Sequence, residues 1–409
     1  MACALGCRYV SPPHTLSRPR KTGGDAELFT NGLILSLLPR LPEIKQTFAL
    51  GDGAYGLMVA ALGTGALCAL HLPAVLIARL GALRTAVSAM WLTAVLLMLA
   101  GLTPSALLFA AVLFMLGFVD AVTDAAQNTH AVAVQLWCQR TIINSMHAAW
   151  SIGATLGGLL GSLAAGLGIP LWLQNFAVAA LIAGLAVWCL RLGAIPAGVI
   201  PRTADNAPVP GGVSSNVSRR ALLTVIPLAL LGLCGVLPED LANNWAGVYL
   251  TQVFGVPIGL AGMGLVAMLV SQVIGRLTAD RLTDRLGAFR WACCGSVLIV
   301  IGSAMIMLAP TAALVYLGFV FNGFGTASLI PTAFAAAGRL SGVAAGTGIT
   351  AVSFMIRLGG TVSSPILGGF SELFGLRAAP ILAILSGVGA ALIAWSRAEP
   401  RQGTKRSED

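Results

Sequence analysis

The hydrophobic residues of this chain gather in long continuous runs, which short polar segments separate. A helix that crosses a bilayer needs about 20 consecutive, mostly apolar residues, and most of the runs reach or approach that length. The runs lie at 27–46, 54–77, 85–102, 105–134, 141–166, 169–190, 221–250, 257–279, 289–309, 311–337, 342–370 and 376–396. This pattern predicts an all-α membrane protein with twelve transmembrane helices.

The first run is the weakest of the twelve. Its apolar stretch covers only residues 28–41, and Asn31, Pro39 and Arg40 interrupt it. We therefore expect either a short first helix or a helix whose start lies elsewhere. The preceding segment 8–21 is polar and Pro-rich, with no apolar core before a cleavage site, so we expect no signal peptide.

One long polar segment divides the runs into two groups of six. It is rich in Pro, Gly and Ser, a composition typical of flexible connections. The expected organisation is a tail (1–26), a six-helix bundle (27–191), a linker (192–220), a second six-helix bundle (221–397) and a second tail (398–409).

The two groups of runs repeat each other in sequence. The matching pairs are 79–84 with 285–290, Phe48 with Phe254, Gly56 with Gly262, and Gly117-Phe118 with Gly323-Phe324, all at an offset of 206, and 160–168 with 367–375 at 207. Matches in register indicate a duplicated unit, a plan that recurs in secondary transporters. We therefore expect two pseudo-symmetric bundles.

The composition favours lipid as the surrounding solvent. Of the 409 residues, 57% are hydrophobic and 10% are charged, whereas about 25% of residues are charged in typical soluble domains. The net charge of +9 does not predict a nucleic-acid partner, because the basic residues are scattered over several loops. Most of them fall on one side of a twelve-span path. Cytoplasmic loops carry such an excess, so we expect a cell inner or plasma membrane and two cytoplasmic termini.

The chain offers no candidate for a metal or covalent site. None of the eight cysteines has the spacing of zinc ligands, and the four histidines are scattered at 14, 71, 130 and 147. The phosphate-binding pattern G-x-x-x-x-G-K-[ST] is also absent. We expect no metal, no cofactor and no enzymatic activity. A channel is an alternative, but the twofold repeat favours a carrier.

The loop after the eighth run resembles the cytoplasmic signature loop of the major facilitator superfamily. The matching residues are Asp284, Arg285, Gly287 and Arg290. Asp280 stands where that pattern has its leading glycine. The resemblance implies the major facilitator fold and a loop that gates the cytoplasmic side.

The first copy of this loop keeps Arg79, Gly81 and Arg84 but has Ala78 at the position of the acid. We expect the gating charge interaction to be concentrated in the second copy.

Four further motifs resemble those of fucose-permease-like and related inner-membrane transporters. They are Arg40-Leu-Pro42-Glu-Ile44, Asp124-x-x-x-Asn128, His147-x-x-x-Ser151-x-Gly153 and Glu239-x-x-x-Asn243-x-Trp245. The relatives of known function are sugar–proton symporters, which implies a small polar solute and proton coupling. Sugar symporters of that branch carry an acid near the position of Leu38, and this chain departs from them there.

Polar residues follow one face of the predicted fourth helix. Asp120, Asp124 and Asn128 recur every four residues, so they share that face. A carboxylate at mid-bilayer is costly and faces a partner or a cavity. Asp124 is therefore a candidate for the proton-coupling or substrate-binding acid. The alternative is a structural, hydrogen-bonded acid.

Three further positions are candidates for the same site. Arg357 lies halfway along the eleventh run, where it needs a counter-charge or an anion; Asp124 and Glu239 are the available acids. His147 is a candidate proton relay near the level of Asn128. The alternatives are a structural ion pair for Arg357 and a structural hydrogen bond for His147.

Glu239, Asn243 and Trp245 follow Pro238, which favours a break in the seventh helix. They are candidates for an outer binding wall, with Trp245 stacking on a sugar-like ring. A frayed helix end is the alternative.

The sequence as a whole predicts a monomeric secondary active transporter that works by alternating access in the lipid bilayer. The leading hypothesis is symport of a small polar solute with protons. The alternative is a proton-driven exporter of drugs or metabolites with the same fold.

Overall fold

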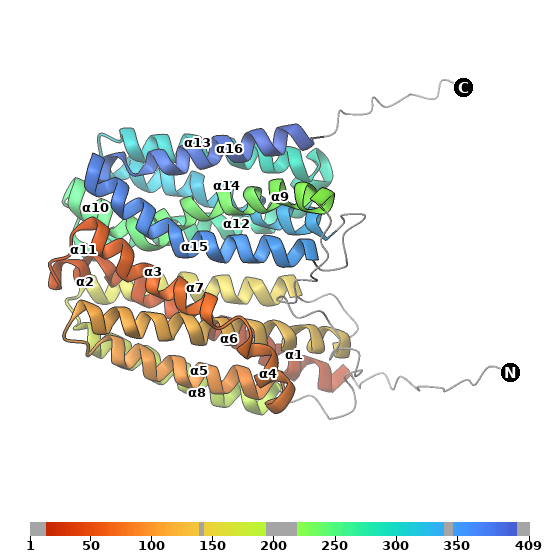
Figure 1. Ribbon diagram of the computed structural model, residues 1–409. Coiled ribbons are helices and arrows are strands. Elements are labelled where there is room, and N and C mark those ends of the chain that lie inside the picture. Colours follow the sequence, from red (N-terminus) through yellow and green to blue (C-terminus); the bar gives the residue numbers. More distant parts are fainter. Residues whose placement is uncertain (1–13, 139–142, 194–218, 339–346, 399–409) are drawn as a thin grey trace, which may run out of the picture.

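The computed structural model describes residues 14–138, 143–193, 219–338 and 347–398. Every regular element in these ranges is a helix, and the helices run side by side, with the start of α1 and the end of α16 at the same end of the molecule (Figure 1). We call that end proximal and the opposite end distal. The linker predicted at 192–220 and the tail predicted at 398–409 lie almost wholly outside the described residues.

The helices before the predicted linker form what we call the first half. They are α1 (His14–Gly32), the 3-10 helix η1 (Leu33–Arg40), α2 (Leu41–Thr47), α3 (Asp52–Cys68), α4 (Leu72–Leu80), α5 (Ala82–Ala100), α6 (Ala106–Cys138), α7 (Ile143–Gly166) and α8 (Leu171–Gly193).

The helices after the predicted linker form the second half. They are α9 (Arg219–Asp240), a π-helical turn (Leu241–Trp245), α10 (Ala246–Phe254), α11 (Ile258–Ala261), α12 (Met263–Leu286), α13 (Ala288–Leu308), α14 (Ala312–Ala337), α15 (Thr347–Phe374), the 3-10 helix η4 (Leu376–Ala378) and α16 (Pro380–Arg397).

Most of these helices are long and apolar enough to cross a membrane. In the described part of the chain nine helical stretches meet this requirement singly, and the pair α3–α4, bent by 55°, makes a tenth. The remaining two predicted spans are the first, built from α1, η1 and α2, and the eleventh, α15. Helix α15 has 28 residues, which is about 42 Å of helix, so polar composition rather than length sets it apart.

The first span differs from its prediction. Its helix begins at His14 instead of near residue 27, so part of the predicted tail 1–26 is helical. The hydropathy of the sequence does not reveal this part of the helix, because it counts charged residues without the side chains that pair with them. Glu27 is fully buried and lies 2.9 Å from Nδ1 of His130 on α6. The helix then tightens into η1, which contains Pro39.

The internal repeat recurs in the packing of the helices. Gly117 on α6 approaches α3 so closely that an added Cβ would lie 1.8 Å from the carbonyl oxygen of Leu62. Gly323 on α14 approaches α12 in the same way, and its Cβ would lie 2.3 Å from the carbonyl oxygen of Met268. Each residue is 206 positions from its counterpart. Small residues permit such backbone contact, and both halves use them at the same place.

Ala49 occupies a backbone position that its repeat fills with glycine. Its φ is +50°, and Gly255, 206 residues later, has a φ of +65°. A left-handed backbone is strained for alanine and free for glycine. We expect Ala49→Gly to stabilise the folded protein by roughly 0.5–1 kcal/mol and Gly255→Ala to destabilise it by about 1 kcal/mol. Thermal unfolding in detergent checks both, and a lower Tm for Ala49→Gly would contradict the argument.

The two halves are joined most closely at the distal end. Helix α3 packs along α15, and α7 packs along α11 and α12. Nζ of Lys45 donates to Oε1 of Gln252 at 3.1 Å, and the hydroxyl of Ser371 donates to Asp52. Lys45 also forms an ion pair with Asp52. These contacts connect charged and polar side chains of both halves, so the distal end is closed in this conformation.

Candidate functional site

An ion pair joins the two halves midway along the bundle. Nη2 of Arg357 on α15 lies 3.3 Å from Oδ2 of Asp124 on α6. The Arg357 side chain is 34% exposed and the Asp124 side chain 48% exposed. Both residues lie far from the ends of long helices, and the distal end is closed. Both side chains therefore keep accessible surface at this depth in the conformation described. Asp124 is thus the partner of Arg357, one of the two acids that the sequence offered.

Two asparagine side chains donate hydrogen bonds to the acids of this site. Nδ2 of Asn128 donates to the Asp124 carboxylate at 2.9 Å and to the Asp124 backbone oxygen at 2.8 Å. Nδ2 of Asn31 on α1 donates to Oδ1 of Asp120 at 3.2 Å. Asp120 also lies within electrostatic range of Asp124 and Arg357. The predicted polar face of α6 is therefore assembled around one ion pair.

A second arginine forms another contact between the two halves. Nη1 of Arg276 on α12 donates to the hydroxyl of Ser151 on α7 at 3.4 Å, across the two halves. His147, one turn from Ser151, lies within electrostatic range of both Asp124 and Arg276. His147 thus lies close enough to charges on both α6 and α12 to respond to them.

Glu239 faces the same region from α9. Its carboxylate accepts a hydrogen bond from Nε2 of Gln272 at 2.6 Å, and Gln272 also donates to the hydroxyl of Thr326 at 3.3 Å. Arg276 acts on Glu239 electrostatically without forming an ion pair with it. Glu239 is therefore held by polar side chains of the second half, and the ion-pair partner of Arg357 is Asp124 instead.

Trp245 does not form the exposed stacking surface that the sequence suggested. It is fully buried, its Nε1 donates to the hydroxyl of Ser364 at 3.2 Å, and its ring meets that of Tyr55 edge-on, with centroids 4.9 Å apart. The hydroxyl of Tyr55 donates to the backbone oxygen of Asn244. In this conformation Trp245 belongs to the contact that closes the distal end, and its role in a binding wall stays a prediction.

The break predicted after Pro238 takes the form of a π-helical turn within a continuous helix. Residues Leu241–Trp245 form this turn, and Asn243 on it is partly buried. Asp240, just before the turn, is 6% exposed and accepts hydrogen bonds from Ser364 at 2.7 Å and from Asn244 at 2.6 Å. π-helical turns are frequent at functional sites. The frayed helix end, considered as an alternative, is wrong for this segment.

The predicted gating loops lie at the proximal end, away from the ion pair. Gly81 and Gly287 end α4 and α12 with nearly the same backbone, at φ +83° and ψ 156° and at φ +85° and ψ 148°. The predicted basic and acidic residues that are exposed here are Arg79, Arg84, Asp284 and Arg285, and Arg290 is partly buried. The two loops therefore share geometry, as their sequence match suggested.

Several residues of the site were not identified from the sequence. Arg276 interrupts the apolar run 257–279 as plainly as Arg357 interrupts its own, so the signal was present. Gln272 lies one turn before it on the same helix. Asn31 also interrupts its apolar run, but its partner Asp120 is far away in the sequence. Ser364 gave no comparable signal, because its role depends on a contact with the distant Trp245.

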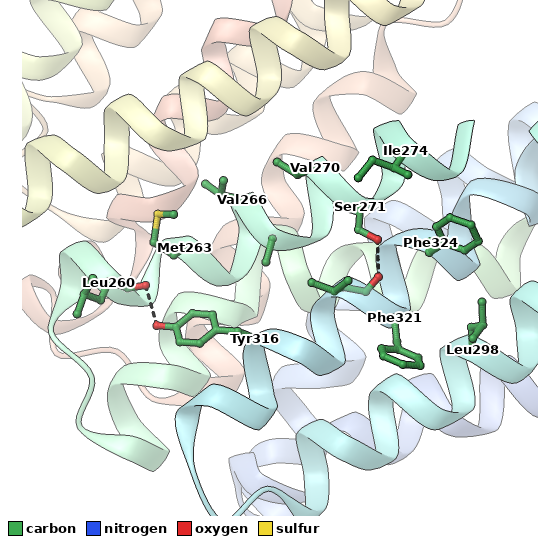
Figure 2. A pocket seen from close by; sticks show the side chains of 12 residues that line it. Leu260, Met263, Val266, Val270, Ser271, Ile274, Leu298, Tyr316, Phe321 and Phe324 are labelled. Carbon is green, nitrogen blue, oxygen red and sulfur yellow. Dashed lines mark hydrogen bonds between the residues drawn. The ribbon is translucent and has the colours of Figure 1, made fainter. Parts of the chain in front are cut away.

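An apolar cavity lies elsewhere, along α12 and α14 (Figure 2). Its volume is about 900 Å³. The residues around it are Leu260, Met263, Val266, Ala267, Val270, Ser271, Ile274, Leu298, Tyr316, Val320, Phe321 and Phe324. None of the predicted site residues is among them. Exposed apolar side chains such as Ile274 at this depth are suited to lipid chains, so the cavity does not explain the charges between the halves.

Comparison with known proteins shows that this chain is similar to membrane transporters. A family model described as Major Facilitator Superfamily matches residues 28–281 and again residues 228–409. An uncharacterised transporter of Sinorhizobium fredii is 30% identical over 375 residues, which cover 91% of this chain and 96% of that protein.

Two solved structures have the same overall fold. The nucleoside transporter NupG superposes with a TM-score of 0.73 at 16% identity, over 92% of this chain and 98% of that one. A D-xylose–proton symporter superposes with a TM-score of 0.73 at 15% identity, over 95% of this chain and 98% of that one. At such identities the likeness concerns the fold.

Proposed function

Because the chain belongs to the Major Facilitator Superfamily and is a membrane transporter rather than an enzyme, we propose that it moves a small polar solute together with protons. The observation that carries this proposal is the Asp124–Arg357 ion pair. It joins the two halves, it lies midway along long helices, and both of its side chains keep accessible surface in the conformation described.

The proposed mechanism couples a proton to the contact between the halves. While Asp124 is ionised, it holds Arg357 and ties α6 to α15. A proton bound to Asp124 removes the charge attraction, which frees Arg357 and lets the halves move. Asn128 keeps the Asp124 carboxyl oriented in either state. The same carboxyl can therefore load a proton on one side of the membrane and release it on the other, as alternating access requires.

The solute is proposed to bind near the same ion pair. Asn31, Asn128 and Gln272 present amide groups there, and Ser151 presents a hydroxyl. Such groups suit a solute with several hydroxyl or amide functions. The solved structures with the same fold include transporters of a nucleoside and of xylose, both polar solutes.

Proteoliposomes test this function directly. Purified protein is reconstituted, an inward proton gradient is imposed, and nucleosides, sugars and sugar acids are added outside in turn while a trapped dye reports internal pH. We expect solute-dependent proton entry for at least one solute class. Solute uptake that is unaffected by the imposed gradient would refute proton coupling. In vesicles loaded with solute, proton-driven movement of that solute outward would instead favour an exporter.

We also propose that the proximal end is cytoplasmic, in the inner or plasma membrane of the cell. The exposed Arg79, Arg84 and Arg285 lie there, and cytoplasmic loops are rich in arginine. A reporter that is active on one side only, fused to each terminus in turn, is expected to place both termini inside. A C-terminus on the outside would contradict the orientation.

The second gating loop is expected to matter more for transport than the first. Asp284→Asn or Arg285→Ala should lower the transport rate more than Arg79→Ala does, because only the second copy has an acid beside its arginine. A lost coupling of about 1 kcal/mol would correspond to about a fivefold effect. Equal losses at matched expression would contradict this prediction.

A further inference from the structure

We propose that Arg276 binds an oxyanion of the transported solute, a carboxylate or phosphate group, between α12 and α7. This inference deepens the proposed function and rests on it. The first observation is the depth of Arg276 in the bundle. Arg276 is the fourteenth residue of the 24-residue helix α12, so about 15 Å of helix separates it from the proximal end. A guanidinium at that depth requires a partner.

The other arginines at membrane depth show what a satisfied guanidinium looks like in this protein. Arg40 is 2% exposed and donates to Glu43 at 2.6 Å, to the backbone oxygen of Ile169 at 2.9 Å and to Gln174 at 2.8 Å. Arg357 has the carboxylate of Asp124. Both are therefore compensated by groups of the chain itself.

Arg276 lacks such compensation. It is exposed, and its hydrogen bond to Ser151 is long, at 3.4 Å. Among the described residues, no carboxylate forms an ion pair with it. Glu239 lies within electrostatic range, but its carboxylate is held by Gln272 at 2.6 Å. The guanidinium thus keeps most of its five donors available in a region where a charge-assisted hydrogen bond is strong.

The groups around Arg276 suit an oxyanion. Ser151 supplies a hydroxyl on the facing helix, and His147 adds an imidazole one turn away. Arginine binds carboxylate and phosphate through two parallel hydrogen bonds. Arg276 on α12 and Ser151 on α7 belong to opposite halves, so an anion bound here contacts both. Its binding would therefore be sensitive to movement of the halves.

The charges of the region also favour movement of this anion together with a proton. Asp120, Asp124 and Glu239 are acids, and Arg276 and Arg357 are bases. A monoanion that enters alone adds a negative charge to a region already rich in carboxylates. A monoanion that enters with a proton for Asp124 leaves the total charge unchanged. Co-transport of an anion with a proton is therefore the electrostatically favoured stoichiometry.

Arginine footprinting on the reconstituted wild-type protein tests the proposal. Phenylglyoxal modification of Arg276 is quantified by mass spectrometry with sodium acetate, sodium gluconate or sodium phosphate present, against chloride at equal ionic strength and against neutral glucose. We expect at least one oxyanion to protect Arg276 in a saturable way. Modification of the exposed Arg79 should stay constant, and the buried Arg40 should stay unmodified. Equal modification of Arg276 in all conditions, or protection by glucose alone, would overturn the proposal.

Two variants give a second readout. The protecting oxyanion should raise the Tm of the wild type, because a ligand that binds only the native state stabilises it. In Arg276→Gln its affinity should fall at least about tenfold, and Arg276→Lys should retain part of it. Unchanged affinity in Arg276→Gln would overturn the proposal.

Oxyanion binding without any proton movement in vesicles would refute only the proton coupling. Proton-coupled uptake of a neutral solute without oxyanion protection would refute only the anion site.

Discussion

Asp124→Asn is expected to abolish accumulation of solute against its gradient while solute binding and exchange remain. The asparagine imitates the protonated acid, so Arg357 loses its counter-charge and the proton loses its site. A coupling free energy of about 1.4–3 kcal/mol corresponds to roughly a 10- to 150-fold loss of gradient-driven uptake. Counterflow exchange needs no net proton movement and should survive.

Asp120→Asn is the matched control for this experiment. Asp120 shares the face of α6 with Asp124, but its hydrogen bond is to Asn31 rather than to an arginine. Its substitution is expected to leave gradient-driven uptake within a few-fold of wild type. A protein with Asp124→Asn that still accumulates solute after a pH step would refute the role of Asp124 and would direct attention to Glu239 or His147.

The sequence predicts the helices that face lipid better than the helices that line the polar region. Ten predicted spans are recognisable from length and apolarity, whereas the first and eleventh are polar where they contribute to the site. Asn31 on the first and Arg357 on the eleventh bind carboxylates of α6. Hydropathy measures suitability for lipid, so it is weakest for the helices that line a polar region.

The site was predictable where a charge stands alone in an apolar run. Arg357 and Arg276 each satisfy that criterion, and Asp124 shares its run only with Asp120. The burial of Trp245 in this conformation was not predictable, for a different reason. Its burial depends on Tyr55, 190 residues earlier, and on Ser364, 119 residues later. A contact of that range is settled by how the halves meet, and no local pattern encodes it.

Gly56→Trp is expected to hold the distal end open and to stop transport. A Cβ on Gly56 would lie 2.4 Å from the backbone oxygen of Ser364 on α15, so even alanine does not fit without displacing that helix. Gly259 stands in the equivalent contact of the second half, where its Cβ would lie 2.4 Å from Cα of Gly166. Both clashes exist only while the distal end is closed. Overpacking typically costs about 1–3 kcal/mol, which would shift the balance of open and closed states by roughly 5- to 150-fold.

A cysteine pair, Asp52→Cys with Ser371→Cys, reports this closure, because these two side chains are in contact across the halves. A short bifunctional thiol reagent should link the pair readily in an otherwise unchanged protein and several-fold less when Gly56→Trp or Gly259→Trp is added. Gly184→Trp is the control, since no atom lies within 4 Å of a Cβ built at Gly184. It should change neither linkage nor transport. If linkage and transport survive Gly56→Trp, the contact of α3 with α15 is not what closes the distal end, and the conformational cycle must rely on other helices.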